Sequence, residues 1–75
     1  MSKIHDVHVV STGTGWRVTR ASRTVSTHRT QRRAIEIGTR LARRTGAELV
    51  THARNGRIRS KDSYGREGSA HDVEH

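Results

Sequence analysis

Three short runs near the amino terminus alternate β-branched or aromatic residues with polar ones, a pattern typical of half-buried β-strands. They span residues 7–11, 16–20 and 23–27. The segments between them are short: Thr12–Gly15 is a turn cluster, and Ala21-Ser22 leaves room only for a tight link. The pattern predicts a three-stranded antiparallel meander.

Residues 31–45 repeat their apolar positions with the period of an amphipathic helix. Thr30 is the expected N-cap, because its hydroxyl can accept from a free N–H of the first turn. Gly46 suits the left-handed position that ends many helices. Gly38 lies inside the apolar stripe, where close approach of the helix to a sheet would explain an interior glycine. The stripe comprises Ala34, Ile35, Ile37, Gly38, Leu41 and Ala42.

The chain after the helix predicts two more strands. Residues 47–54 contain a β-branched run, and residues 57–60 form the returning strand. Asn55-Gly56 between them favours a type I′ turn, in which both central residues have positive φ. The expected fold is α+β with the order β-β-β-α-β-β and the helix packed on one face of the sheet. Residues 1–65 form a single domain, and 66–75 a disordered acidic tail.

One helix covers one face of such a sheet, so strand alternation divides the side chains between a core and an open face. Trp16 is expected to anchor the core, with an exposed stacking residue as the alternative. The expected core residues are Val7, Val9, Trp16, Val18, Val25, Leu49 and Ile58. The open face should collect Arg17, Thr19, Thr24 and Ser26, with some of Arg54, Arg57 and Arg59. A register shift of one residue would invert a strand.

Composition narrows the function classes. Hydrophobic residues make up 29% of the 75 residues, with one Trp, one Tyr and no Phe. So thin a core has no room for a deep active-site pocket, and dimerisation is one way to bury more area. The absence of cysteine excludes disulfides and Cys-based zinc sites, which small secreted domains usually need. No run approaches the ~20 apolar residues of a membrane span, so we expect a cytoplasmic protein.

The charge is strongly one-sided, with 15 Lys and Arg against 7 Asp and Glu, for a net charge of +8. Thirteen of the fifteen are arginine, which forms bidentate contacts with phosphate. A GC-rich genome explains the excess of Arg over Lys equally well, but not the net charge. Residues 1–61 carry +11 and residues 62–75 carry −3. This division favours a body that binds a polyanion, with the acidic tail as a competitor for the basic surface.

The polar side of the predicted helix is also basic, and a solvated surface explains it as well as a binding face does. We expect Glu36 to offset part of this charge through Arg40, four residues on. The arginines concerned are Arg32, Arg33, Arg40, Arg43 and Arg44.

Candidate chemistry is sparse. No nucleophile–base pair and no carboxylate pair is visible, so we expect no enzyme activity. Gly13-Thr14-Gly15 is too short for a phosphate loop and precedes a strand, so it indicates a hairpin turn. The spacings His5/His8 and His71/His75 suggest a metal site, but the second pair lies in the predicted tail. We expect no metal and no cofactor.

Five motifs, taken in order, resemble the small bacterial and phage proteins of domain-of-unknown-function family 2188, over about residues 7–65. They are His8-Val9-Val10, Gly15 to Val18, Thr30 to Ile35, Ala47 to His52, and Gly56 to Gly65. The resemblance implies a fold but no mechanism, since the family name records no activity. This chain departs from it by carrying Arg29, Arg32 and Arg33 where acidic residues are more usual. A nucleic-acid role would therefore apply to this member in particular.

The leading hypothesis is a small basic protein that binds the phosphate backbone of a nucleic acid. A duplex is favoured, because aromatic platforms for stacking bases are nearly absent. The alternative is a protein-interaction or self-assembling module, of phage origin, that uses the open sheet face. A homodimer and a host partner protein stay open, and no membrane contact is expected. The expected nucleic-acid contacts are Arg17, Arg20, Arg23, Arg54, Arg57 and Arg59.

Overall fold

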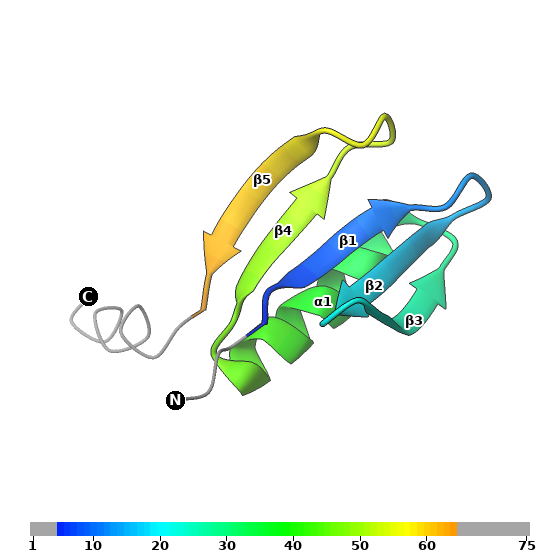
Figure 1. Ribbon diagram of the computed structural model, residues 1–75. Coiled ribbons are helices and arrows are strands. Elements are labelled where there is room, and N and C mark those ends of the chain that lie inside the picture. The colour runs from blue at the N-terminus through cyan, green and yellow to red at the C-terminus, as the bar shows by residue number, and fades with distance from the viewer. Residues whose placement is uncertain (1–4, 65–75) are drawn as a thin grey trace.

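The computed structural model describes residues 5–64, in which a five-stranded sheet carries one helix on one face (Figure 1). This confirms the predicted α+β order and the position of the helix. The predicted acidic tail lies outside the described residues. Over residues 5–64, no helix is long and apolar enough to cross a membrane. The elements are β1 (Val7–Ser11), β2 (Trp16–Arg20), β3 (Arg23–His28), α1 (Gln31–Thr45), β4 (Glu48–His52) and β5 (Ile58–Ser63).

Strand β1 lies at the centre of the sheet, whose order is β3-β2-β1-β4-β5. It pairs antiparallel with β2 and parallel with β4, while β2–β3 and β4–β5 are antiparallel. Because β1, β3 and β4 run in the same direction, the connections that follow all three leave at one end of the sheet (Figure 1). We call this the three-loop end; it comprises Thr12–Gly15, Arg29–Thr30 and Ala53–Arg57.

The core lies between α1 and the sheet face that it covers. The sequence placed Val7, Val9, Trp16, Val18 and Leu49 in the core, and all five are buried. Full burial of a Val or Leu side chain contributes about 1.5–3 kcal/mol, so each of these residues stabilises the fold. The helix and the margins add Ala34, Ala42 and Ala47, with Ile35, Ile37, Leu41 and Tyr64 partly buried against them.

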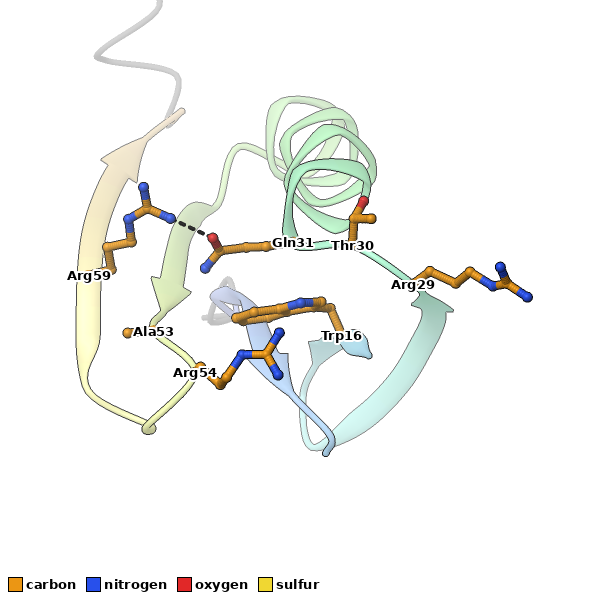
Figure 2. A pocket seen from close by; sticks show the side chains of 7 residues that line it. All are labelled: Trp16, Arg29, Thr30, Gln31, Ala53, Arg54 and Arg59. Carbon is orange, nitrogen blue, oxygen red and sulfur yellow. Dashed lines mark hydrogen bonds between the residues drawn. The ribbon is translucent and has the colours of Figure 1, made fainter. Parts of the chain in front are cut away.

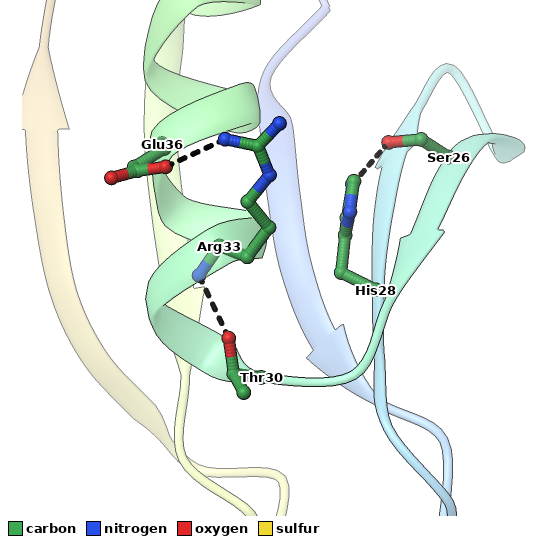
Figure 3. Close-up of polar contacts among 5 residues, drawn as sticks. All are labelled: Ser26, His28, Thr30, Arg33 and Glu36. Carbon is green, nitrogen blue, oxygen red and sulfur yellow. Dashed lines mark hydrogen bonds and ion pairs between the residues drawn. The ribbon is translucent and has the colours of Figure 1, made fainter.

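Both ends of α1 are capped as predicted. The Thr30 hydroxyl accepts from the N–H of Arg33 at 3.1 Å (Figure 3). Gly46 takes the left-handed conformation, with φ 72° and ψ 26°. The expected pair between Glu36 and Arg40 is wrong, because Glu36 accepts from Arg33 at 2.9 Å instead (Figure 3). Residues three apart on a helix are neighbours as much as residues four apart.

A β-bulge in β3 overturns two of the predicted side-chain positions. Val18 pairs with Ser26, but Thr19 pairs with Thr24, so Val25 is an extra residue with no partner opposite. Ser26 therefore shares the helix-side face with Val18 and does not lie on the open face. Val25 does not enter the core and is 50% exposed.

A second bulge, in β5, overturns the core assignment of Ile58. Thr51 pairs with Ser60 and His52 pairs with Ile58, so Arg59 is the extra residue. Ile58 shares the open face with His52 and is 58% exposed. Both bulges lie in edge strands, where they hinder pairing with the edge of another sheet.

The turn at Asn55-Gly56 is a hairpin connection, as predicted, but it is not of type I′. Gly56 has a φ of 96°, whereas Asn55 is not among the residues with positive φ. The N–H of Gly56 donates to Ala53 O at 2.9 Å, and the N–H of Ala53 donates to Arg57 O at 2.7 Å. This is a three-residue loop, in which only the last residue needs the conformational freedom of glycine.

The type I′ signature occurs instead at the predicted tight link. Ala21 and Ser22 have φ values of 54° and 64°, and Arg20 pairs directly with Arg23 across them. Only a two-residue turn fits there, although the left-handed region costs an L-residue roughly 1–2 kcal/mol.

Gly38 lies where α1 packs tightly against the sheet. A Cβ atom there would lie 3.0 Å from Leu49 Cδ1, 3.2 Å from Val9 Cγ2 and 3.6 Å from Val7 Cγ1. All three neighbours are buried, so a close-packed interior gives them little room to move. This confirms close approach to the sheet as the reason for an interior glycine.

We expect Gly38→Val to destabilise the fold by about 1–3 kcal/mol, because the added side chain meets Leu49 and Val9. Thr39→Val, one position along the helix, is the matched control and should stay within about 0.5 kcal/mol of the parent. Urea unfolding followed by circular dichroism measures both. Equal stability of the two variants would contradict the tight approach.

Candidate functional site

Arginine side chains gather at the three-loop end because three connections meet there. Arg29 lies in the β3–α1 connection, and Arg54 and Arg57 lie in the β4–β5 loop. Others come from the adjoining ends of strands and from the first turn of the helix. The seven arginines of this end are Arg17, Arg29, Arg32, Arg33, Arg54, Arg57 and Arg59.

Carboxylates lie mostly toward the opposite end. Asp6 precedes β1, Glu48 begins β4, and Asp62 pairs with Leu49 near the start of β4. The fourth described carboxylate, Glu36, binds Arg33 at 2.9 Å. Within residues 5–64, the other six arginines of the three-loop end form no ion pair. The first turn of α1 also contains no acidic residue, so the partial positive charge of the helix N-terminus adds to theirs.

The structure divides the six predicted contact residues between two ends of the sheet. Arg20 and Arg23 flank the Ala21-Ser22 link at the end opposite the three-loop end. They line a separate hollow there with Val25 and other residues. The four predicted residues that the structure brings together at the three-loop end are Arg17, Arg54, Arg57 and Arg59.

An open pocket lies between the start of α1 and the β4–β5 loop (Figure 2). Trp16 forms its floor and is only 5% exposed, which confirms its predicted role as a core anchor. The Arg54 guanidinium lies over the indole, with Cζ 5.9 Å from the ring centroid, a cation–π contact. The pocket is lined by Trp16, Arg29, Thr30, Gln31, Ala53, Arg54 and Arg59.

Gln31 holds this pocket together. Its Nε2 donates to the backbone oxygen of His52 at 3.0 Å, and its Oε1 accepts from the guanidinium of Arg59 (Figure 2). The amide nitrogen of Gln31 thus donates to a carbonyl and the amide oxygen accepts from a guanidinium, which fixes the orientation of the side chain. The side chain of Arg59 is held beside the pocket as a result. Sequence reasoning missed Gln31, because a glutamine at a helix start gives no sign of partners 21 and 28 positions away.

A second hollow adjoins this pocket on the side of the β1–β2 loop. The two share Trp16 and Arg29, so together they form a concave strip across the three-loop end. Arg17 borders the strip on one side and Arg59 on the other. Sequence reasoning also missed Arg29 as a candidate contact; its position directly before the N-cap was the available signal. We call this surface the arginine strip.

No group of three or more His, Cys, Asp or Glu side chains within residues 5–64 is placed to hold a metal ion. The His71/His75 spacing lies outside the described residues.

Comparison with known proteins identifies the family. Residues 7–64 match a family described as an uncharacterized protein conserved in bacteria, DUF2188. The chain belongs to this family, as the motifs along the sequence indicated. No curated protein and no solved structure matches the chain. The family description supplies no activity, so function has to be argued from the site.

Replacing Gln31 tests how the pocket is held together. We expect Gln31→Met to cost about 1 kcal/mol, because the His52 carbonyl and the Arg59 guanidinium each lose a partner. Thermal unfolding should show a decrease in Tm of roughly 4–8 °C for a domain of this size. Arg32→Met, at the adjacent exposed position, is the control. A Gln31 variant as stable as the control would show that the amide contributes no net stabilisation.

Proposed function

For this member of an uncharacterized bacterial family, we propose that the arginine strip binds the phosphate backbone of a nucleic acid, with a duplex as the favoured partner. The observation that carries the proposal is the concentration of seven arginines at the three-loop end, where, among the residues that the structure describes, only Arg33 is paired with a carboxylate. Guanidinium groups bind phosphate oxygens through charge-assisted and often bidentate hydrogen bonds. The function needs no catalytic residue, metal or cofactor.

Two of these arginines are already held in place. Arg54 lies over the Trp16 ring, and Arg59 is hydrogen-bonded to Gln31. A long side chain that is restricted before binding loses less conformational entropy when it meets a ligand. These two side chains are therefore the strongest candidates for direct phosphate contacts.

The aromatic residues favour a duplex over a single strand. Single-strand binders stack bases on exposed aromatic rings. Trp16 is buried under Arg54, and Tyr64 packs against the core with Arg43 over its ring at 5.5 Å. From Arg17 on β2 to Arg59 on β5 the strip crosses three strand spacings of about 4.8 Å, or roughly 14 Å, enough to meet the backbones on both sides of a major groove about 12 Å wide.

The alternative is a protein-interaction or self-assembling module that uses the open sheet face. Its support is Ile58, which is 58% exposed on that face. Val50, at the centre of the same face, is buried, so the apolar area that a partner could cover is small. The bulges in β3 and β5 also oppose edge-to-edge assembly. We therefore rank this function second.

Salt dependence and a matched pair of double variants test the proposal. Binding to a mixed-sequence duplex, followed by fluorescence anisotropy, should weaken by orders of magnitude between about 50 and 200 mM salt. Arg54→Gln with Arg59→Gln should weaken binding by at least about tenfold, because two phosphate contacts are lost. Arg43→Gln with Arg44→Gln removes the same charge from the opposite end of α1 and should change binding by less than about threefold.

Two results would contradict the proposal. Absence of duplex binding at low salt would exclude the nucleic-acid function and favour the protein-interaction alternative. Equal losses in the two double variants would show that net charge, and not the arginine strip, determines binding.

A further inference from the structure

His8 in β1 and His52 in β4 lie side by side on the open face of the sheet. Their ring centroids lie 5.3 Å apart, and the two ring planes are inclined by 28°. His8 Nδ1 lies 3.0 Å from His52 Nε2. The other ring nitrogen of His52, Nδ1, lies 3.2 Å from the backbone oxygen of Gly56 in the β4–β5 loop. The two rings thus connect β1, β4 and this loop.

These contacts fix the tautomers of both rings when they are neutral. A carbonyl oxygen only accepts, so Nδ1 of His52 carries a hydrogen and donates to Gly56. Nε2 of His52 is then the acceptor, and Nδ1 of His8 is the donor. Nε2 of His8 is left with a free lone pair.

The pair accommodates one proton but not two. The first proton goes to Nε2 of His8, where it disturbs neither hydrogen bond. The second proton can bind only to Nε2 of His52, and that atom already accepts a hydrogen bond from His8. Two N–H groups would then face each other across 3.0 Å, and two cationic rings would lie with their centroids 5.3 Å apart. The second proton therefore breaks the contact between the rings.

The consequence falls on the loop that carries the candidate phosphate contacts. His52 ends β4, and its backbone oxygen accepts from Gln31, which holds Arg59. Its side chain holds Gly56, two residues beyond Arg54. His52 thus secures the β4–β5 hairpin to β1 and to α1 at once.

We propose that the His8–His52 pair is a proton-operated latch on the β4–β5 hairpin, closed with one proton or none and released by the second. The claim that this latch regulates the arginine strip rests on the proposed function. The release itself is a property of the folded chain and is measurable without nucleic acid. Histidines change charge between about pH 5 and 8, so mild acid is the condition that opens the latch.

Charged groups of both signs surround the pair. Asp6 and His5 line the same hollow as His8 and His52. Pairing and strand alternation place further charged side chains on the open face. They are Arg17 on β2, Glu48 on β4 and Lys61 on β5, of which Glu48 and Lys61 pair at 3.9 Å.

Amide hydrogen exchange of the full chain, read by NMR, tests the latch. The amides of Ala53 and Gly56 close the hairpin loop. Their protection, corrected for intrinsic exchange rates, should fall about tenfold or more between about pH 7.5 and pH 5, an interval in which histidine side chains in general gain charge. The amide of Thr12, which closes the β1–β2 loop, should keep its protection and serves as the internal control.

Two variants at position 8 separate the latch from a general effect of acid. In His8→Asn, the side-chain amide occupies the place of Nδ1 and can donate or accept without titrating, so protection of Ala53 and Gly56 should be independent of pH. In His8→Ala, protection should be low at both pH values. The latch proposal is wrong if the parent protein keeps its amide protection in acid, or if His8→Asn loses protection as the parent does.

Duplex binding near pH 5 then connects the latch to the proposed function. The His8→Asn variant should bind more tightly than the parent, although it carries less positive charge, because its arginines stay in place. Tighter binding by the parent would show that added charge outweighs loop order and would overturn the regulatory role. If neither protein binds a duplex, the proposed function fails. The exchange measurements still test whether the second proton releases the hairpin.

Discussion

The parallel pairing of β1 with β4 is the constraint on which the rest of this structure depends. It aligns Val7 with Leu49 and Val9 with Thr51, which places buried side chains of both strands beneath α1. The same pairing brings the β4–β5 loop to the end of the sheet where the β1–β2 loop and the helix start already lie. Packing of the core and clustering of arginines are thus two results of one strand arrangement.

Local signals predicted the elements well, because strand alternation, helix period and capping residues act over a few positions. Thr30 and Gly46 cap α1 as expected, and Trp16 is buried. The alternation of apolar and polar residues could not reveal the bulges at Val25 and Arg59. A bulge leaves one residue without a partner on the neighbouring strand, and nothing in the residue types marks which residue that is. The parallel pairing and the contacts of Gln31 join distant parts of the chain and have no local signature, so the sequence did not reveal how the arginine strip is assembled.

Several residues within the family motifs have a structural explanation. A Cβ atom on Gly15 would lie 2.5 Å from the backbone oxygen of His28, so the β1–β2 loop passes this close to the end of β3 only with glycine there. Trp16 fills the core beneath Arg54, and Gln31 joins α1 to β4 and β5. These residues build the scaffold of the three-loop end, and the arginines that it presents give this chain its charge.

The central claim is that phosphate polymers meet this protein at the three-loop end. Titration of the isotopically labelled chain with a short mixed-sequence duplex, followed through its backbone amide NMR signals, tests it most directly. The account predicts that the largest shifts fall in Thr12–Gly15, Arg29–Thr30 and Ala53–Arg57. Shifts concentrated at Ala21-Ser22 and Gly46, or on the open face around Val50, would contradict it.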